Sequence, residues 1–307
     1  MTSAPVDVMA LIVNYGTPDL TIDCVRSLRA TTGVTMRIVV IDNASRDDSV
    51  ERIRAALPDI RLVVLDRNSG YTGGNNVGFA LAAEGGARYA FVLNSDTTVD
   101  PHCLARLVAA ADADPGVALL NPCIVFPDPA HGLWFGGSRF SLWTGRAEHV
   151  GRRQPVTAGL PHASDIVFVT GCAMLVRVAA LDDIGPFDES LFAYGEDLDF
   201  SLKARAAGYR ARYVPGAMVT HLEGVSHIKA GGQALRVYLH HRNLLRVLRR
   251  HARWFHWLTI APVFLVDSVA RHLFLRIRAR DIAGVRAVFA GIRAGLSRRP
   301  QRPNPAA

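Results

Sequence analysis

Short apolar runs alternate with amphipathic segments along the N-terminal third of the chain, and this alternation limits the fold more than any other feature. The runs "VMALIVNY", "RIVVIDNAS", "IRLVVLDRN" and "YAFVLNSDTTVD" are each followed by a segment whose apolar residues recur at helical spacing. Continuous apolar runs of this length are typical of strands that are buried on both faces. Strands that alternate with helices form parallel sheets with right-handed crossovers. We therefore predict an α/β fold with a mostly parallel sheet flanked by helices.

Polar residues stand at the end of each of these runs, in the motifs "NYG", "DNAS", "DRNSG" and "NSD". Ligands of such sheets bind outside the carboxyl ends of the strands, so these residues suit a polar ligand with hydroxyls and phosphates. The segment "NSGYTGGNNVG" (68–78) is rich in glycine and asparagine. It lacks the G-x-G-x-x-G spacing of dinucleotide folds and the lysine of a P-loop, which argues against a dehydrogenase or a P-loop protein.

The stretch "LFAYGEDLDF" (191–200) places Glu196, Asp197 and Asp199 within an aromatic, apolar frame. An ionised carboxylate resists burial unless it is paired, hydrogen-bonded or bound to metal. The stretch is compatible with an ordinary helix start, because the helix dipole favours acids in the first turn. It is also compatible with a general base at a helix N-terminus that faces a cleft. Taken alone, the residues favour the ordinary helix start.

Two further residues could bind a metal ion. Asp96 ends the fourth apolar run, where a carboxylate could hold a divalent cation on diphosphate oxygens or could simply cap a turn beside Thr97. His221 ends a later predicted strand, with His227 shortly after it. A neutral imidazole at that position could ligate metal, although a hydrogen-bonded surface histidine is the more common case.

The C-terminal segment is strongly basic. Residues 236–307 contain 15 Arg, no Lys and two acids, which gives a charge of +13, whereas residues 1–235 carry −5. The apolar run "WLTIAPVFLV" (257–266) covers ten residues and contains Pro262, and a membrane-spanning helix needs about 20. We therefore expect a helix that lies in a membrane interface, with tryptophans at headgroup depth and arginines against anionic lipid. A packing helix with a solvated arginine face is the alternative. Nucleic acid fits less well, because no binding motif accompanies the high apolar content.

These features divide the chain into three parts. Residues 1–235 are expected to form the α/β domain, 236–296 a basic amphipathic helical extension close to the membrane, and 297–307 a disordered tail. Within the first part, residues 126–164 are rich in Gly, Pro and Trp and are expected to be irregular. The N-terminus has no positively charged lead, so we expect no secretory signal and a cytoplasmic protein that is peripheral at the inner face of the membrane.

Seven motifs occur in a fixed order over residues 8–245. They are "IVNYG", "VVIDNASRDDS", "RNSGYTGGNNVGF", "VLNSDTTVDP", "GCAMLVRVAALDDIGPFDESLFAYGEDLDFSLKARAAGY", "VPGAMVTHLEGVS" and "YLHHRNLLRVLRRH". In this order the chain resembles family 2 glycosyltransferases of the GT-A (Rossmann-like) fold. The resemblance is greatest to the bacterial rhamnosyltransferase-like branch, which builds surface polysaccharide.

The resemblance implies a role for each motif. The donor nucleotide site would comprise Val13, Asn14, Tyr15, Asp42, Gly74, Asn75, Asn76, Asn94 and Ser95. Asp96 and His221 would bind a divalent cation, Mn²⁺ or Mg²⁺. The family usually has an acid at the position of Asn94, so only one carboxylate is offered there. Asp197 would be the catalytic base, with Glu196 beside it in the acceptor site.

The resemblance thus implies an inverting, metal-dependent glycosyltransferase. The donor would be a dTDP- or UDP-sugar, with dTDP-rhamnose as the best candidate. The acceptor would be a glycan or a polyprenyl-diphosphate-linked glycan, and no nucleic acid would be bound. The competing hypothesis is a non-catalytic protein, descended from such an enzyme, that binds sugar nucleotides or acts as a membrane scaffold. Asn94 supports this alternative, and the Glu196–Asp197 pair argues against it.

Overall fold

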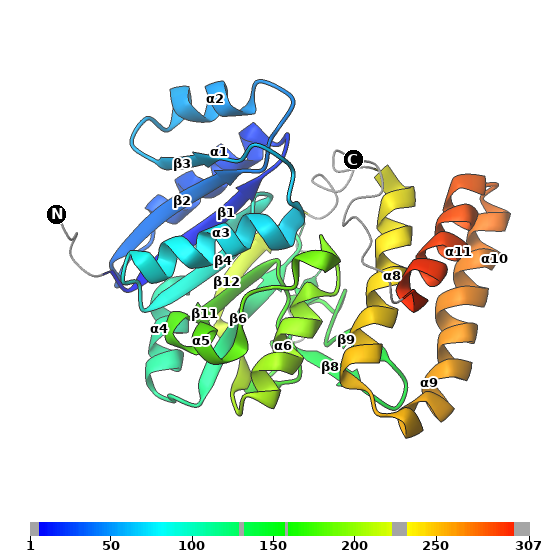
Figure 1. Ribbon diagram of the computed structural model, residues 1–307. Coiled ribbons are helices and arrows are strands. Elements are labelled where there is room, and N and C mark those ends of the chain that lie inside the picture. The colour runs from blue at the N-terminus through cyan, green and yellow to red at the C-terminus, as the bar shows by residue number, and fades with distance from the viewer. Residues whose placement is uncertain (1–5, 129–131, 157–158, 223–231, 298–307) are drawn as a thin grey trace.

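The computed structural model describes residues 6–128, 132–156, 159–222 and 232–297, and it is built on a ten-stranded mixed sheet (Figure 1). The strand order along the main path is β10-β12-β6-β11-β4-β1-β2-β3, with β5 paired to β12 and β7 paired to β6. The strands are β1 (Val8–Asn14), β2 (Met36–Asp42), β3 (Arg61–Val64), β4 (Tyr89–Asn94), β5 (Thr97–Val99), β6 (Val117–Val125), β7 (Leu133–Phe135), β10 (Ser164–Ile166), β11 (Ala173–Arg177) and β12 (Arg210–His221).

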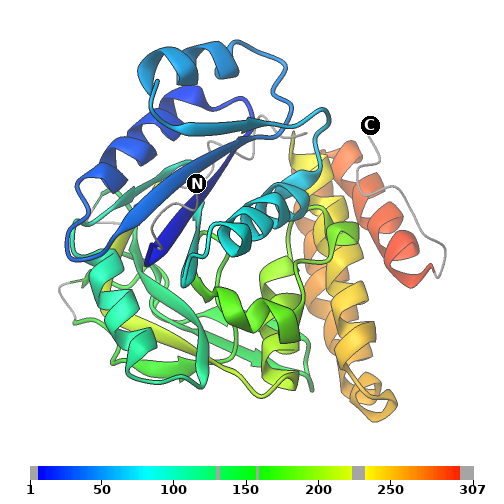
Figure 2. The same cartoon turned by 60° about the vertical axis from the view of Figure 1, so that its left-hand side comes forward.

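Helices cover both faces of this sheet, and each face has its own hydrophobic core (Figures 1 and 2). The helices of this part are α1 (Pro18–Arg29), α2 (Ser49–Ala56), α3 (Gly70–Glu84), α4 (Cys103–Asp112), α5 (Leu181–Ile184) and α6 (Glu196–Ala206). Side chains of α1, α2 and α4 join one core, and side chains of α3, α5 and α6 join the other. The predicted α/β architecture is confirmed.

Strands β3, β2, β1 and β4 are parallel neighbours, as the alternation predicts. Their registers align Val13 with Ile41 on one side and with Asn94 on the other. The polar residues at the ends of β1, β2 and β4 therefore lie at one edge of the sheet. Strand β11 is antiparallel to both β4 and β6, which makes the sheet mixed beyond β4.

The fourth apolar run forms two strands rather than one. Strand β4 ends at Asn94, residues Ser95 and Asp96 make a turn, and β5 begins at Thr97. Strand β5 pairs antiparallel with β12, in a register that aligns Thr97 with His221. This pairing places the end of β12 beside the turn that carries Asp96.

Much of the insert expected to be irregular is regular where the structure describes it. It contains β7 and a hairpin of β8 (Ser138–Ser141) and β9 (Arg146–His149). The pattern misses these strands because each has only three or four residues and glycines lie between them. Trp134 lies in β7 and is buried, so the expectation of an irregular segment is wrong at this position.

Helices form the C-terminal part, as predicted. They are α8 (Gly232–His251), α9 (Trp257–Val263), a π-helical segment (Phe264–Ala270), α10 (Arg271–Arg278) and α11 (Ile282–Leu296). The boundary expected after residue 235 falls within α8. His227 and residues 298–307 lie outside the described residues.

The apolar run near Pro262 belongs to a longer helix than its composition suggests. The helical stretch Trp254–Arg278 has 25 residues, a mean hydropathy of 1.5 in its most apolar window, and little burial within the protein. By length and composition alone, this one stretch among the described residues could cross a membrane. The expectation that the run is too short to span is therefore wrong on length, because the helix continues through Pro262 and Asp267 to Arg278.

Candidate active site

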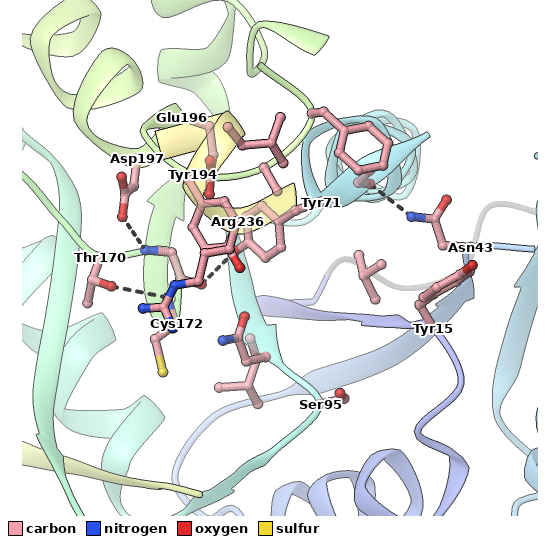
Figure 3. Close-up of a pocket in the computed structure, with 18 of the residues that line it drawn as sticks. Tyr15, Asn43, Tyr71, Ser95, Thr170, Cys172, Tyr194, Glu196, Asp197 and Arg236 are labelled. Carbon is pink, nitrogen blue, oxygen red and sulfur yellow. Dashed lines mark hydrogen bonds between the residues drawn. The ribbon is translucent and has the colours of Figure 1, made fainter. Parts of the chain in front are cut away.

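A cavity of about 330 Å³ opens at the carboxyl ends of β1 and β4 (Figure 3). Its wall is completed by the start of α3, the loop before β11, the loop before α6 and the first turns of α8. Seven of the site residues predicted from the sequence lie on this wall: Val13, Tyr15, Asn94, Ser95, Glu196, Asp197 and His221. The fold thus brings residues from both halves of the α/β part to one place.

The other six predicted site residues do not line the cavity: Asn14, Asp42, Gly74, Asn75, Asn76 and Asp96. Asn14 and Asp42 are fully buried, and Asn14 Nδ2 donates to Asp42 Oδ2 at 2.7 Å. Neither residue reaches the cavity, so the direct contact with a nucleoside expected of this pair stays a prediction. The pair instead braces the ends of β1 and β2, with Ser45 Oγ donating to Asp42 Oδ2 at 2.7 Å.

The α3 residues are likewise engaged within the protein. Asn75 Nδ2 donates to the carbonyl of Tyr71 at 2.8 Å, and Asn76 Nδ2 donates to the carbonyl of Phe187 at 3.0 Å. Gly74 allows α3 to approach β1, because a Cβ there would lie 3.0 Å from the methyl groups of Val13. These residues seat α3 and do not reach the cavity.

Asp96 and His221 form a buried pair, in which His221 lies on the cavity wall and Asp96 contacts it. Nε2 of His221 lies 3.2 Å from Oδ1 of Asp96, and both side chains are almost inaccessible to solvent. Neither ring nitrogen of His221 has a hydrogen-bond partner among the described residues. A buried imidazole that faces a carboxylate oxygen at this separation fits two ligands of one divalent cation, because imidazole nitrogen and carboxylate oxygen both bind such ions.

This pair would not hold a metal ion by itself. No cluster of three or more His, Cys, Asp or Glu side chains suited to metal occurs in the described ranges. Mg²⁺ and Mn²⁺ sites commonly use one or two protein ligands together with waters and substrate phosphates. The two residues therefore fit a cation that is shared with a phosphorylated ligand. Asn94 lines the cavity next to them and offers no charge.

Glu196 and Asp197 occupy another part of the wall, at the first turn of α6 (Figure 3). Burial, together with the neighbouring Asp197 carboxylate, raises the pKa of Glu196 to about 8. Its Oε2 has no hydrogen-bond partner in the described structure. Glu196 is therefore protonated at neutral pH, and its Oε2 is left to form a hydrogen bond with a ligand.

Asp197 is held by the backbone. Its Oδ2 accepts from the N–H of Gly171 at 3.3 Å, and its Oδ1 accepts from the N–H of Leu198 at 2.8 Å. Burial raises the pKa of Asp197, and these two donors oppose the rise because they favour the charged form. The pair thus combines one neutral acid with one carboxylate that is more basic than usual.

Several cavity residues escape prediction from the sequence. Tyr71 donates its hydroxyl to the carbonyl of Gly171 at 2.5 Å, and Trp134 packs edge-on against His221 with ring centroids 4.8 Å apart. Arg236 lies with its guanidinium carbon 5.9 Å from the centre of the Tyr194 ring. Tyr71 lies within the predicted motif 68–78 but is not distinguished there, and no local motif marks Trp134 or Arg236, because the fold brings them in from distant segments. Asn43 had a signal, since it follows Asp42 at the end of β2.

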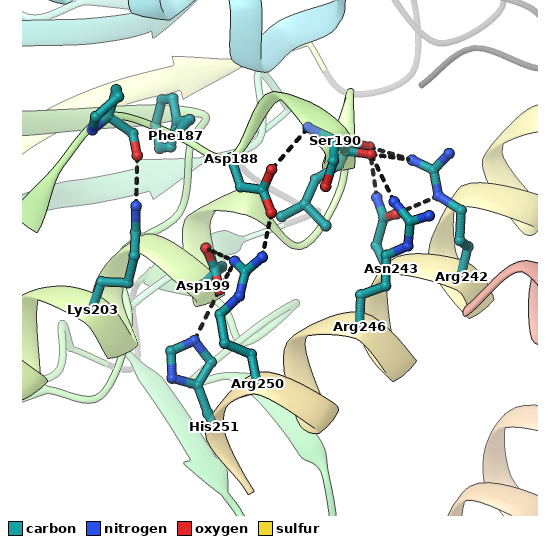
Figure 4. Close-up of polar contacts among 12 residues, drawn as sticks. Phe187, Asp188, Ser190, Asp199, Lys203, Arg242, Asn243, Arg246, Arg250 and His251 are labelled. Carbon is teal, nitrogen blue, oxygen red and sulfur yellow. Dashed lines mark hydrogen bonds and ion pairs between the residues drawn. The ribbon is translucent and has the colours of Figure 1, made fainter. Parts of the chain in front are cut away.

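Arginines of α8 that were expected to face a membrane bind groups within the protein. Arg242 is fully buried and donates to the carbonyls of Ser190 and Leu191 at 3.1 and 2.8 Å. Arg246 donates to Ser190 at 3.1 Å, and Arg250 donates to both oxygens of Asp199 at 2.8 Å (Figure 4). The expectation that the arginines of this helix meet lipid is wrong for the fully buried Arg242. Arg246 and Arg250 have partners within the protein, because α8 docks onto α6 and the loop before it.

Comparison with known proteins identifies the family. The model of glycosyl transferase family group 2 matches residues 89–287, which is more than half of the chain and includes Asp96, Asp197 and His221. The chain belongs to this glycosyltransferase family.

Curated relatives of the glycosyltransferase match it over different lengths. It is 40% identical over 109 residues to succinoglycan biosynthesis protein ExoO of Rhizobium meliloti, covering 35% of this chain and 30% of that protein. It is 27% identical to N-acetylglucosaminyl-diphospho-decaprenol L-rhamnosyltransferase of Mycobacterium tuberculosis, covering 82% and 87% of the two chains. It is 21% identical to dTDP-rhamnosyl transferase RfbF of Shigella flexneri, covering 70% and 71%.

Solved structures confirm the GT-A fold. GalNAc-T7 with UDP, GalNAc and Mn²⁺ matches the glycosyltransferase with a TM-score of 0.61 and 17% identity, over 80% of this chain and 48% of that one. The mannosyltransferase PcManGT of Pyrobaculum calidifontis, in complex with GDP-Man and Mn²⁺, matches with a TM-score of 0.57 and 15% identity, over 97% and 82%.

Proposed function

We propose that this glycosyltransferase moves a sugar, with rhamnose from dTDP-rhamnose as the leading candidate, onto a glycan or a polyprenyl-diphosphate-linked acceptor with inversion at the anomeric carbon. The observation that carries the proposal is one cavity with Glu196, Asp197 and His221 on its wall, where His221 is paired with the buried Asp96. Two relatives with names that include rhamnosyl transfer, one of them acting on a diphospho-decaprenol, support this choice of donor and acceptor.

Asp96 and His221 would hold a divalent cation, Mn²⁺ or Mg²⁺, against the donor diphosphate. When bound, such a cation offsets the charge that develops on the leaving nucleoside diphosphate. The Mn²⁺ in two structural neighbours supports this assignment. Tyr15, Ser95 and Asn43 line the adjoining part of the cavity and would contact the nucleoside.

Asp197 would act as the general base. Its carboxylate would take the proton of the acceptor hydroxyl as that oxygen attacks the anomeric carbon from the face opposite the diphosphate. A positioned base contributes about 10² to 10⁴ in rate, and one displacement inverts the configuration. Protonated Glu196 would donate a hydrogen bond to the acceptor sugar and thereby orient the attacking hydroxyl.

We further propose that the enzyme acts as a peripheral protein at the cytoplasmic face of a membrane. Large apolar side chains are exposed on the Trp254–Arg278 helix, among them Trp254, Leu258 and Phe274. Arginines interleave with them, and such a surface suits the interface of an anionic bilayer. A lipid-linked acceptor would be delivered at the same interface.

A thermal-shift panel tests the proposed function. A ligand that binds only the folded state raises the melting temperature. We expect dTDP-rhamnose or a UDP-sugar to raise it in the presence of Mn²⁺, and nicotinamide dinucleotides to leave it unchanged. A protein that responds to no nucleotide sugar would contradict the proposal. A protein that binds a nucleotide sugar but releases no nucleoside diphosphate with any acceptor would favour the non-catalytic alternative.

A further inference from the structure

The loop that leads into α6 has an unusual backbone. Phe192 and Tyr194 have φ angles of +67° and +70°, and Gly195 follows at +84°. Positive φ is uncommon and strained for residues with a side chain. Both aromatic side chains line the cavity immediately before the Glu196–Asp197 pair. The strained residues thus directly precede the two acids of the site. A strained backbone persists only if other contacts hold it in place.

Asn243 of α8 supplies three of those contacts. Its Nδ2 lies 2.8 Å from the carbonyl oxygens of both Leu191 and Ala193, and 2.7 Å from that of Tyr194. The side chain is almost completely buried. One side-chain amide therefore contacts the backbone carbonyl groups of Leu191, Ala193 and Tyr194, in and around the strained segment.

Arg242 fixes the orientation of that amide. Its Nε donates to Oδ1 of Asn243 at 2.8 Å, which leaves Nδ2 facing the loop. Its Nη2 donates to Ser190 and Leu191 (Figure 4). Burial of a guanidinium is costly, and hydrogen bonds to Asn243 and to carbonyl groups of the loop before α6 offset part of that cost.

From these contacts, and resting on the proposed function, we infer that Asn243 and Arg242 are positioning residues for the glycosyl transfer reaction. They hold residues 190–195 in the strained conformation that points Tyr194 into the cavity and starts α6 at Glu196. Asp197 then faces the cavity with its backbone donors aligned. Helix α8 is accordingly part of the catalytic apparatus, although it lies in the basic C-terminal part of the sequence.

Arg249 provides a matched control. It lies on the same helix and also donates to two backbone carbonyls, those of Gly295 and Leu296 on α11, at 2.9 and 2.7 Å. Arg242→Met and Arg249→Met therefore remove the same chemical group and the same kind of contact. Only Arg242→Met loosens the loop before α6. Asn243→Leu removes the amide while nearly keeping its shape.

Nucleoside diphosphate release from the nucleotide sugar is measured for these variants. We expect Asn243→Leu and Arg242→Met to lower kcat about 10- to 100-fold, the size of effect caused by a shift of about 1 Å in a catalytic group. The donor KM should change by less than about threefold, because the donor side of the cavity is built from other elements. Arg249→Met should retain the wild-type kcat. Equal kcat values for the Arg242 and Arg249 variants would overturn the inference.

Hydrogen exchange of the backbone amides of residues 190–197 gives a second test that needs no activity. Exchange in this loop should be at least about tenfold faster in Asn243→Leu than in Arg249→Met, with the strands of the sheet unchanged. Unchanged exchange in the loop would overturn the positioning role even if no donor is turned over. The two proposals can fail separately. If the wild-type enzyme turns over no donor but the loop exchanges faster in Asn243→Leu, the proposed function is contradicted, whereas the role of Asn243 in holding the loop is supported.

Discussion

His221 Nε2 lies 3.2 Å from Asp96 Oδ1 because β12 runs antiparallel to β5 and ends beside the turn after β4. The two residues are far apart in the sequence, and the register of a three-residue strand brings them together. The candidate cation site therefore depends on the strand pairing as much as on the two side chains.

Loss of the imidazole should weaken the response to metal. We expect His221→Ala to raise the Mn²⁺ concentration for half-maximal nucleoside diphosphate release at least about tenfold, since even changes around metal ligands cost 10- to 100-fold in affinity. The exposed His102 offers the control, and His102→Ala should leave the Mn²⁺ dependence unchanged. Identical metal titrations for the two variants would remove His221 from the cation site.

Glu196 should limit activity at alkaline pH. Its pKa of about 8 means that it loses its proton as the pH rises through 8, which removes a hydrogen-bond donor and places a second charge beside Asp197. Activity should therefore fall above pH 8 in the wild type. Glu196→Gln keeps an N–H donor and cannot ionise, so its activity should stay level to higher pH. A pH–rate profile with the same alkaline limb in both proteins would contradict this role.

The same group should make stability depend on pH. In the folded protein Glu196 keeps its proton up to about pH 8, whereas in the unfolded chain it releases the proton near the ordinary value of 4.5. The unfolded state thus binds fewer protons in this window, and the free energy of unfolding decreases as the pH rises through it. Urea unfolding of Glu196→Gln should show a smaller decrease between pH 5 and 8. An equal decrease would show that Glu196 is ionised in the folded state.

Asp42 should contribute to stability because its carboxylate accepts from Asn14 and Ser45 in a fully buried position. We expect Asp42→Ala to lower the free energy of unfolding by about 1–3 kcal/mol, since it leaves buried donors without an acceptor. Asp23 is exposed on α1, and Asp23→Ala should change stability by less than about 0.5 kcal/mol. Urea unfolding measures both. If Asp42→Ala lost nucleotide binding at unchanged stability, Asp42 would contact the donor directly.

Membrane docking should depend on the exposed apolar side chains of Trp254–Arg278. Leu265 and Phe274 have exposed fractions of 61% and 62%. Their double replacement by Asp should reduce flotation with anionic vesicles at least about tenfold, because each buried apolar side chain contributes about 1.5–3 kcal/mol. Val64→Asp, on the edge strand β3, should float like the wild type. A wild-type protein that ignores anionic vesicles would refute membrane docking.

Much of the α/β part could be predicted because local pattern determines it. The apolar runs and helical spacing identify β1, β2, β4, α1 and α3, and the acids after Gly195 mark the start of α6. What the pattern misses arises from tertiary contact. Trp134 and Arg236 reach the cavity from short or distant elements, and nothing near them in the sequence signals this.

The misassigned arginines of α8 show the same limit. Their spacing among leucines is equally suited to a lipid interface and to a protein groove, because both accept an apolar stripe flanked by cations. The two environments differ in the partners that they offer the arginines, which local pattern cannot supply. Here those partners are the carbonyls of Ser190 and Leu191 and the Asp199 carboxylate. Local pattern likewise does not show that Nδ2 of each predicted α3 asparagine donates to a nearby carbonyl, so their role in donor binding stays a prediction.

The most direct test of the account is the rate of nucleoside diphosphate release by Asp197→Asn with Mn²⁺ and the donor that stabilises the wild type. We expect a rate at least about 100-fold below wild type, as for loss of a general base, with the donor-induced rise in melting temperature preserved. A variant that binds the donor and turns it over at the wild-type rate would show that the carboxylate at the start of α6 does not take the acceptor proton.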